Sequence, residues 1–310
     1  MNLPSHPTPG PERDLIGYGR DVPRVQWPDD ARVAVNLVVN MEEGSEVQMP
    51  VDGRNESILG EMPVLGLEPQ YRDLALESVY EYGSRAGIWR LQRLFDDRQV
   101  PATLFAAAVA IERNPRVGEW IREAGHDICS HGWRWEEVWK LTRDEEREHI
   151  QAAISSFQST CGQRPLGWYC RYGPSVHTRE LLVEEGGFVY DSDAYNDDLP
   201  YFTQVTGREH LVVPYTFTYN DARFVNVGGY ASPSDFFDQC RRGLDYLWDE
   251  GATHPRMMSI GLHPRLIGQA ARASALAEFI DYAKAKGNVW FARRIDIANW
   301  WLEHHSEFDV

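Results

Sequence analysis

The chain has 310 residues, of which 43% are hydrophobic and 25% are charged. This length and composition predict a globular protein with a large core, in one barrel-sized domain or in two smaller ones. The formal net charge of −16 makes duplex nucleic acid and anionic membranes poor partners, so we expect no binding to either.

Residues 1–31 are rich in proline and polar side chains and are predicted to form an irregular arm. They contain neither the basic nor the apolar segment of a secretory signal, and no window of the chain is apolar enough to span a bilayer. The four cysteines form no Cys-x-x-Cys pair. We therefore expect a cytoplasmic protein with reduced, mostly buried thiols.

An apolar, β-branched run at residues 33–39 predicts a strand that is covered on both faces, as in parallel sheets. It is followed by two adjacent carboxylates, Glu42 and Glu43, and by Gly44. α/β proteins place reactive groups just beyond the carboxyl ends of such strands. A solvated acidic turn would look the same, so the pair needs support from other segments. The irregular stretch 47–77 is predicted to be a functional loop over the strand ends.

Beyond this loop, helical and strand patterns alternate with short connections. Predicted strands cover residues 102–107, 127–130, 166–170, 188–190, 212–215, 224–227, 257–262 and 289–292. Predicted helices cover residues 83–98, 115–124, 142–161, 178–185, 232–250, 273–286 and 295–304, and Thr142-x-x-Glu145 is a capping box. This alternation predicts a parallel α/β architecture, and about seven strands favour a barrel. We expect one domain, residues 32–310, preceded by the arm 1–31.

Polar side chains directly follow most of these strands, namely Glu42, Glu43, His131, Arg171, Asp191, Asp193 and His263. In a barrel they would lie on one rim around a common pocket. The set supplies what amide hydrolysis needs: a carboxylate to take a proton from water, an imidazole to protonate the departing nitrogen, and a cation or metal for the oxyanion.

Each residue also has a structural interpretation. His131 alone is more typical of a hydrogen-bonded structural histidine, His263 fits both interpretations equally, and Arg171 could simply pair with Asp191 or Glu43. The joint pattern of strand ends, rather than any single residue, favours an active site.

Cysteine chemistry is a competing hypothesis. Cys170 could act as a thiolate nucleophile with His177 or His131. A buried, inert thiol is the commoner case.

The order Glu42-Glu43-Gly44, His131, Arg171, His263 resembles the motif series of the polysaccharide deacetylase (NodB-homology) superfamily, over about residues 32–301. The resemblance implies a single distorted TIM barrel of the (β/α)7 type. In that superfamily an Asp-Asp pair supplies a general base and a metal ligand, and a His-x-x-x-His motif supplies two more ligands. Here the acidic pair is Glu42-Glu43, and Trp135 stands where the second histidine is expected.

This departure bears on metal binding. An indole nitrogen only donates, so Trp135 cannot ligate a metal, and one histidine with one carboxylate falls short of a three-ligand zinc site. We therefore expect no metal and no cofactor. If zinc is bound, the resemblance implies Glu43 and His131 as ligands, with Asp193 or Glu46 as a conceivable third.

The same departures are similar to one branch of the superfamily, the cofactor-independent allantoinases and cyclic imide hydrolases. The likeness lies in DLIGYG (14–19), EEGSE (42–46), ESVYEYGSRAGIWRL (77–91), SHGWRW (130–135), EEGGFVYDSDAYNDDLPY (184–201) and SIGLHPRLIG (259–268). It implies a hydrolase that opens a C–N amide bond in a small cyclic ureide or imide, allantoin being the first candidate, without a metal. It also implies a homo-oligomer, and a tetramer is the expected form.

In this hypothesis, the water-activating base is Glu42 or Glu43. His131 and His263 hold the substrate and move a proton to the leaving nitrogen, while Arg171 or Arg265 stabilises the oxyanion. The predicted substrate contacts are Trp133, Trp135, Asp191, Asp193 and Arg265. Two alternatives stay open: a zinc-dependent deacetylase or deformylase of N-acyl substrates, and a non-catalytic barrel that serves as a binding module.

Overall fold

The structure, a computed structural model, describes residues 10–56 and 67–308. Residues 1–9 of the predicted arm and 57–66 of the predicted loop lie outside this part. The strands are β1 (Val33–Met41), β2 (Thr103–Ala106), β3 (Asp127–Ser130), β4 (Gly167–Trp168), β5 (Tyr190–Asp191), β6 (Tyr201–Val205), β7 (Arg208–Val212), β8 (Arg256–Leu262) and β9 (Val289–Phe291).

The α-helices are α1 (Met49–Asp52), α2 (Leu74–Tyr82), α3 (Ile88–Arg98), α4 (Ala108–Arg113), α5 (Pro115–Ala124), α6 (Arg143–Cys161), α7 (Thr178–Glu185), α8 (Pro233–Glu250), α9 (Ala270–Lys286) and α10 (Arg294–His304). Short turns of other helix types are η1 (Pro28–Asp30), η2 (Gly83–Gly87), η3 (Val138–Lys140), η4 (Asp221–Phe224) and η5 (His305–Glu307). Within the two described segments, no helix combines the length and the apolar character needed to cross a membrane.

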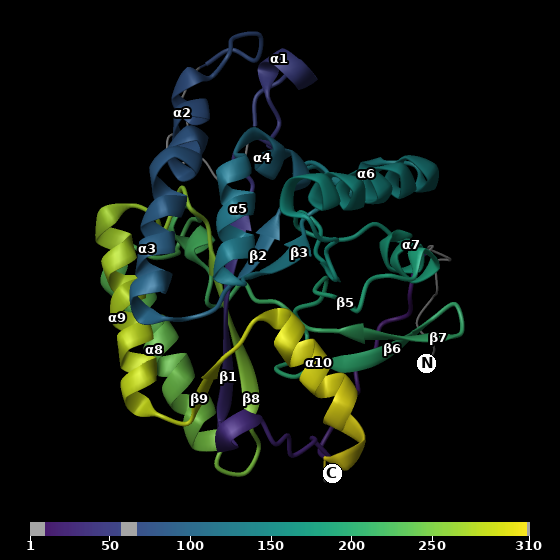
Figure 1. The fold of residues 1–310 in the computed structure, drawn as a ribbon, viewed down its shortest axis with the longest axis vertical. Helices are drawn as coiled ribbons and strands as arrows, with labels where there is room; N and C mark the ends of the chain where they lie inside the picture. The colour runs from purple at the N-terminus through teal and green to yellow at the C-terminus, as the bar shows by residue number, and fades with distance from the viewer. Residues whose placement is uncertain (1–9, 57–66, 309–310) are drawn as a thin grey trace, which may run out of the picture.

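One curled sheet organises the molecule, and β1 lies between β2 and the last strand of the sheet order, β8 (Figure 1). The strand order is β6-β7-β5-β4-β3-β2-β1-β8, and β9 pairs with the start of β1. The pairs are parallel except for the antiparallel hairpin of β6 and β7. The sheet forms a half-barrel with helices outside it, which confirms the predicted distorted α/β barrel.

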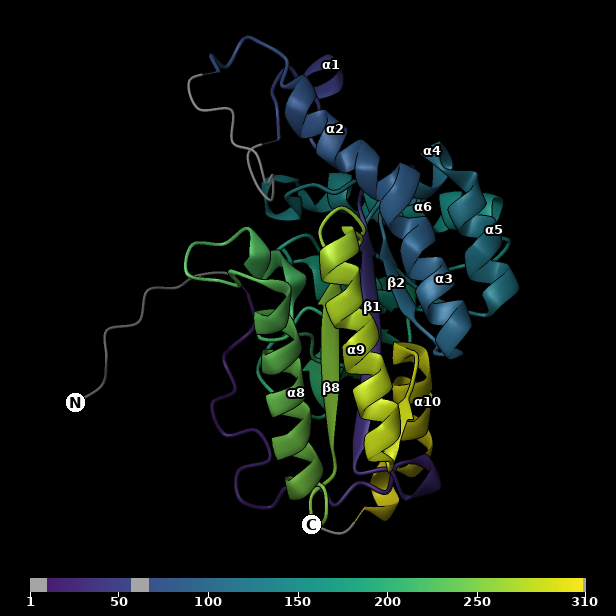
Figure 2. The same cartoon turned by 90° about the vertical axis from the view of Figure 1, so that its left-hand side faces the viewer.

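β1 has two buried faces of different character, because successive side chains of a strand point to opposite sides. All nine of its residues are buried. The odd-numbered residues, such as Val35 and Val39, pack in the cluster that also holds the helices. The even-numbered Ala34 and Val38 pack in a second cluster inside the curl. α8 and α9 lie side by side along the outer face of β1 and β8 (Figure 2).

Several local predictions are confirmed and others are wrong. The capping box at Thr142 and Glu145 begins α6, and the four cysteines are free and buried. The strand predicted at 224–227 is wrong, because this stretch ends the 3-10 helix η4 and then turns. The hairpin of β6 and β7 was not predicted. The helix predicted to begin at residue 83 begins at Leu74 instead, because Asp73 caps it and the chain passes the glycines at 83 and 87 as a π-turn.

Candidate active site

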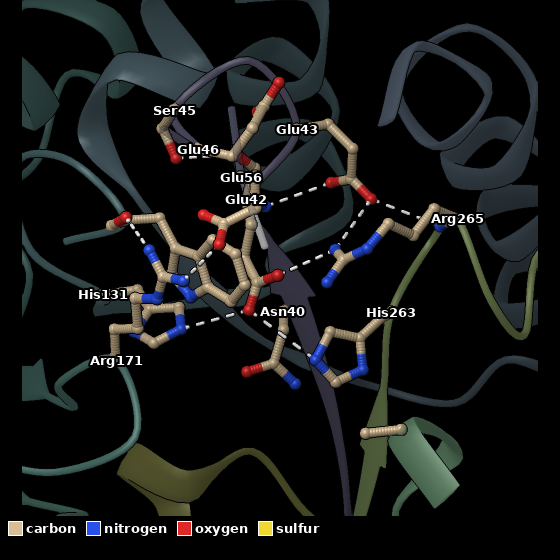
Figure 3. Close-up of polar contacts among 12 residues, drawn as sticks. Asn40, Glu42, Glu43, Ser45, Glu46, Glu56, His131, Arg171, His263 and Arg265 are labelled. Atoms are coloured by element: carbon tan, nitrogen blue, oxygen red, sulfur yellow. Dashed lines mark hydrogen bonds and ion pairs between the residues drawn. The ribbon is translucent and has the colours of Figure 1, made fainter. Parts of the chain in front are cut away.

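The carboxyl ends of three strands bring Glu42, His131 and His263 to one small cavity (Figure 3). Its volume is about 190 Å³. Its lining consists mostly of aromatic and amide side chains around one carboxylate and two imidazoles: Asn40, Glu42, His131, Trp135, Tyr169, Tyr172, Tyr215, Phe217, Asn220, Ala222, Asn226 and His263. A space of this kind, apolar with a few convergent polar groups, is typical of a site for a small molecule.

Glu42 is the centre of the polar contacts. Its Oε1 lies 3.3 Å from Nε2 of His131 and 3.6 Å from Nε2 of His263, and its Oε2 lies 2.7 Å from Nη1 of Arg265. Burial alone would raise the pKa of this carboxyl, but Arg265 and the two histidines lower it to about 2. Glu42 is therefore an anion throughout the physiological range.

Both imidazoles direct Nε2 towards Glu42, and Nδ1 of each ring has another partner. Nδ1 of His131 lies 3.0 Å from the carbonyl oxygen of Tyr169, and because a carbonyl only accepts, Nδ1 carries the proton. Nδ1 of His263 donates to Oδ1 of Asp221 at 2.6 Å. Burial would lower the pKa of His263, but Asp221 and Glu42 raise it above the ordinary value. The imidazolium form of His263 therefore persists to higher pH.

Asp221 is a site residue that sequence reasoning missed. Its second oxygen, Oδ2, accepts from the backbone N–H groups of His263 and Ile267 at 2.7 and 3.0 Å. It thereby fixes both the ring and the backbone of His263. Asp221 begins η4 and follows no strand, so a search restricted to strand ends could not find it.

Glu43 points away from Glu42, at the turn that follows β1 (Figure 3). It lines a separate cavity of about 270 Å³ on the helix side, beneath the π-turn. There is no room for a side chain at Gly83, because a Cβ would collide with the Glu43 carboxylate. Burial raises the pKa of Glu43 to about 7; Arg265 opposes this shift and the Glu42 anion adds to it.

The two candidate arginines lie in different surroundings. Arg265 is fully buried between the carboxylates, 2.7 Å from Glu42 and 3.5 Å from Glu43. Arg171 pairs with Glu56 at 2.8 Å and stacks 3.8 Å above the ring of Trp135. Asp191 and Glu43 had been predicted as partners of Arg171. This was wrong, because Glu56, in the loop that follows β1, forms the ion pair instead.

Some predicted contacts do not reach the cavity. Asp191 pairs with Arg179 at 2.7 Å and with His210 of the unpredicted β7 at 2.8 Å. Asp193 accepts from the backbone N–H of Cys170, and the ring of Trp133 packs on His149. The expectation that Asp191, Asp193 and Trp133 line the pocket is therefore wrong, whereas Trp135 does line it.

The residues present do not fit the zinc site that the superfamily motifs imply. Glu43 and His131 line different cavities. Within residues 10–56 and 67–308, no group of three or more His, Cys, Asp or Glu side chains is arranged to hold a metal ion. Cys170 is buried, and burial raises the pKa of its thiol well above the ordinary value, which disfavours the thiolate hypothesis.

Comparison with known proteins agrees with the fold. Residues 74–190 match the family model for polysaccharide deacetylase. A putative polysaccharide deacetylase of Schizosaccharomyces pombe is 35% identical over 313 residues, which is 94% of this chain and 98% of the relative. The crystal structure of a probable polysaccharide deacetylase from Pseudomonas aeruginosa superposes with a TM-score of 0.90 and 48% identity, again over 94% and 98% of the two chains.

The fold and these relatives define an α/β-barrel hydrolase. The chain belongs to the polysaccharide deacetylase family, as the sequence motifs predicted. Within the family it is similar to a solved structure named Puue allantoinase, with a TM-score of 0.90 and 47% identity over 94% of this chain and 98% of that one.

Proposed function

We propose that the protein is a hydrolase that opens a ring at a C–N amide bond in a small cyclic ureide or imide, with allantoin as the first candidate. The likeness to an allantoinase at 47% identity over nearly the whole chain carries this proposal. The size of the cavity supports it, because about 190 Å³ suits a single small ring and not a polysaccharide chain.

In the proposed reaction, Glu42 takes a proton from water while the water oxygen bonds to a ring carbonyl carbon. The ring C–N bond then breaks, and the imidazolium of His263 gives the proton on its Nε2 to the departing nitrogen. The proton on Glu42 passes to His263, whose Nε2 is 3.6 Å away. The product is an open chain with one new carboxyl group and one new N–H.

The pairing of Glu42 with Arg265 and two histidines favours one class of substrate. A carboxylate with a pKa of about 2 is a weak base, because general bases work best with a pKa near the working pH. Such a base suits a carbonyl that is already electrophilic. Cyclic imides and ureides have such carbonyls, whereas a simple N-acetyl amide does not.

A panel assay tests the proposal. Allantoin, hydantoin, dihydrouracil, succinimide, glutarimide and phthalimide are each incubated with the protein and a chelator, and ring opening is followed by chromatography. N-acetylglucosamine oligomers are assayed in parallel for acetate release. We expect opening of at least one ring and no acetate. Acetate release, or no ring opening at all, would overturn the proposal in favour of a deacetylase or a binding module.

A further inference from the structure

Asn40 offers the cavity a single hydrogen-bond acceptor. It lies in β1 two residues before Glu42, so both side chains point to the same side of the strand. Its Nδ2 donates to the carbonyl oxygen of Leu262 at 3.2 Å and to Oη of Tyr215 at 3.0 Å. Because a carbonyl only accepts, these contacts fix the orientation of the amide. Oδ1 of Asn40 then has no hydrogen-bond donor within the described residues.

Tyr215 offers the complementary donor. Its Oη accepts from Nδ2 of Asn40 and, at 3.3 Å, from Nδ2 of Asn220. The amide of Asn220 is itself oriented, because its Oδ1 accepts from the backbone N–H of Ala222. Two donated hydrogen bonds occupy the lone pairs of the phenol oxygen, so its own hydrogen is left for a ligand.

The surroundings hold this phenol in place. The rings of Phe105 and Tyr169 lie 5.0 Å from the ring of Tyr215, centroid to centroid. Gly261 of β8 also lies close to it, because a Cβ at this position would collide with the phenol oxygen. Asn40 itself is 2% exposed and lies between His131 and His263 in the view of Figure 3. Donor and acceptor are thus adjacent, rigid and close to Glu42.

We infer that Asn40 and Tyr215 together recognise one –NH–C(=O)– unit of the substrate ring. Oδ1 of Asn40 accepts from the ring N–H, and the Tyr215 hydroxyl donates to the adjacent carbonyl oxygen. This inference rests on the proposed ring-opening function and narrows its substrate class to rings whose nitrogen beside the scissile carbonyl is unsubstituted. The hydrogen bond from Tyr215 strengthens as that oxygen becomes an oxyanion, so Tyr215 also acts in the chemical step.

Matched substrates test the acceptor. We compare kcat/KM for succinimide with N-methylsuccinimide and for hydantoin with 3-methylhydantoin. The wild type should prefer the N–H ring by about 100-fold or more, because a buried acceptor left unpaired is costly. Asn40→Leu, which keeps the branched shape of the side chain and removes its polar atoms, should reduce this preference to below about tenfold. Tyr215→Phe should lower kcat/KM for both rings by about 10-fold to 100-fold and leave the preference unchanged.

An N-methyl ring could also react slowly because its methyl group is too large for the cavity. Ligands of equal size distinguish this steric cause from the loss of the N–H hydrogen bond. 2-Pyrrolidinone and γ-butyrolactone differ in an N–H against an oxygen, and the wild type should be inhibited at least about tenfold more strongly by the lactam. This comparison needs no variant, so it holds even if a substitution prevents folding. Equal inhibition, or a preference in Asn40→Leu as large as in the wild type, would overturn the inference. If the wild type opens no ring, the proposed function itself fails; if it opens N–H and N-methyl rings alike, only the recognition of the N–H fails.

Discussion

Two fully buried arginines lie in this barrel, and their surroundings differ in kind. Arg294, inside the curl of the sheet, donates to neutral oxygens on every side: Asn36, Ser192, Val213, Pro214 and Ser259. Arg265, at the strand ends, faces two carboxylates, yet its Nε and Nη2 have no hydrogen-bond acceptor within the described residues.

The difference separates a structural polar network from a functional one. Five matched hydrogen bonds to neutral dipoles tie four segments of the chain together and leave Arg294 nothing further to bind. Arg265 instead keeps Glu42 charged, with part of its own hydrogen-bonding capacity unused. A buried cation that is only partly paired is typical of a site where charge is needed for chemistry.

The largest expected effect is on the structural side. Replacing Arg294 by Met leaves several buried oxygens without donors, so we expect the free energy of unfolding to fall by about 3–5 kcal/mol. Urea denaturation measures this loss. Arg293→Met is the control at the neighbouring position, because Arg293, the N-cap residue of α10, is partly exposed and pairs with Asp296 at 2.5 Å. It should cost about 1 kcal/mol or less. If both variants lost similar amounts of unfolding free energy, the buried network of Arg294 would not be a special support of the fold.

Burying the charged form of Glu43 lowers the free energy of unfolding at higher pH. Its pKa is about 7 in the folded protein and 4.5 in its unperturbed state. The folded state thus binds the proton more tightly, and stability is lost as the pH rises from about 4.5 to about 7. Glu43→Gln removes this loss and should raise the free energy of unfolding at pH 8 by about 1–3 kcal/mol, with little effect at pH 4. If Glu43→Gln destabilised the protein at pH 8 instead, the prediction would be wrong, and the charged form of Glu43 would stabilise the fold by pairing with Arg265.

The smallest effect is a shift in pH dependence. Asp221 and Glu42 raise the pKa of His263, so the proton-donating form should persist above the ordinary histidine range. Activity should fall on the alkaline side as His263 loses that proton. Asp221→Asn removes one anion and should move this alkaline limb to lower pH, measured as kcat against pH. An unmoved limb, or one that moves higher, would contradict the assignment of His263 as the acid.

The sequence predicted the parts of the site that obey a regular geometric rule. Glu42, His131 and His263 follow parallel strands, and parallel strand ends meet at one edge. Asp221 and Tyr215 could not be predicted in this way, because they lie in the irregular connection after β7. The ion-pair partner of Arg171 was predicted wrongly, because the actual partner, Glu56, lies in a loop with no periodic signal.

The pair of adjacent glutamates gives the most direct test of the account. On the ring that the wild type opens fastest, kcat/KM is measured for Glu42→Gln and for Glu43→Gln, with circular dichroism to verify folding. We predict a loss of about 1,000-fold or more for Glu42→Gln, because it removes the water-activating anion. Glu43→Gln should lose less than about tenfold, because Glu43 faces the other cavity. Equal losses in the two variants, or a Glu42→Gln variant within tenfold of the wild type, would contradict a reaction centred on Glu42.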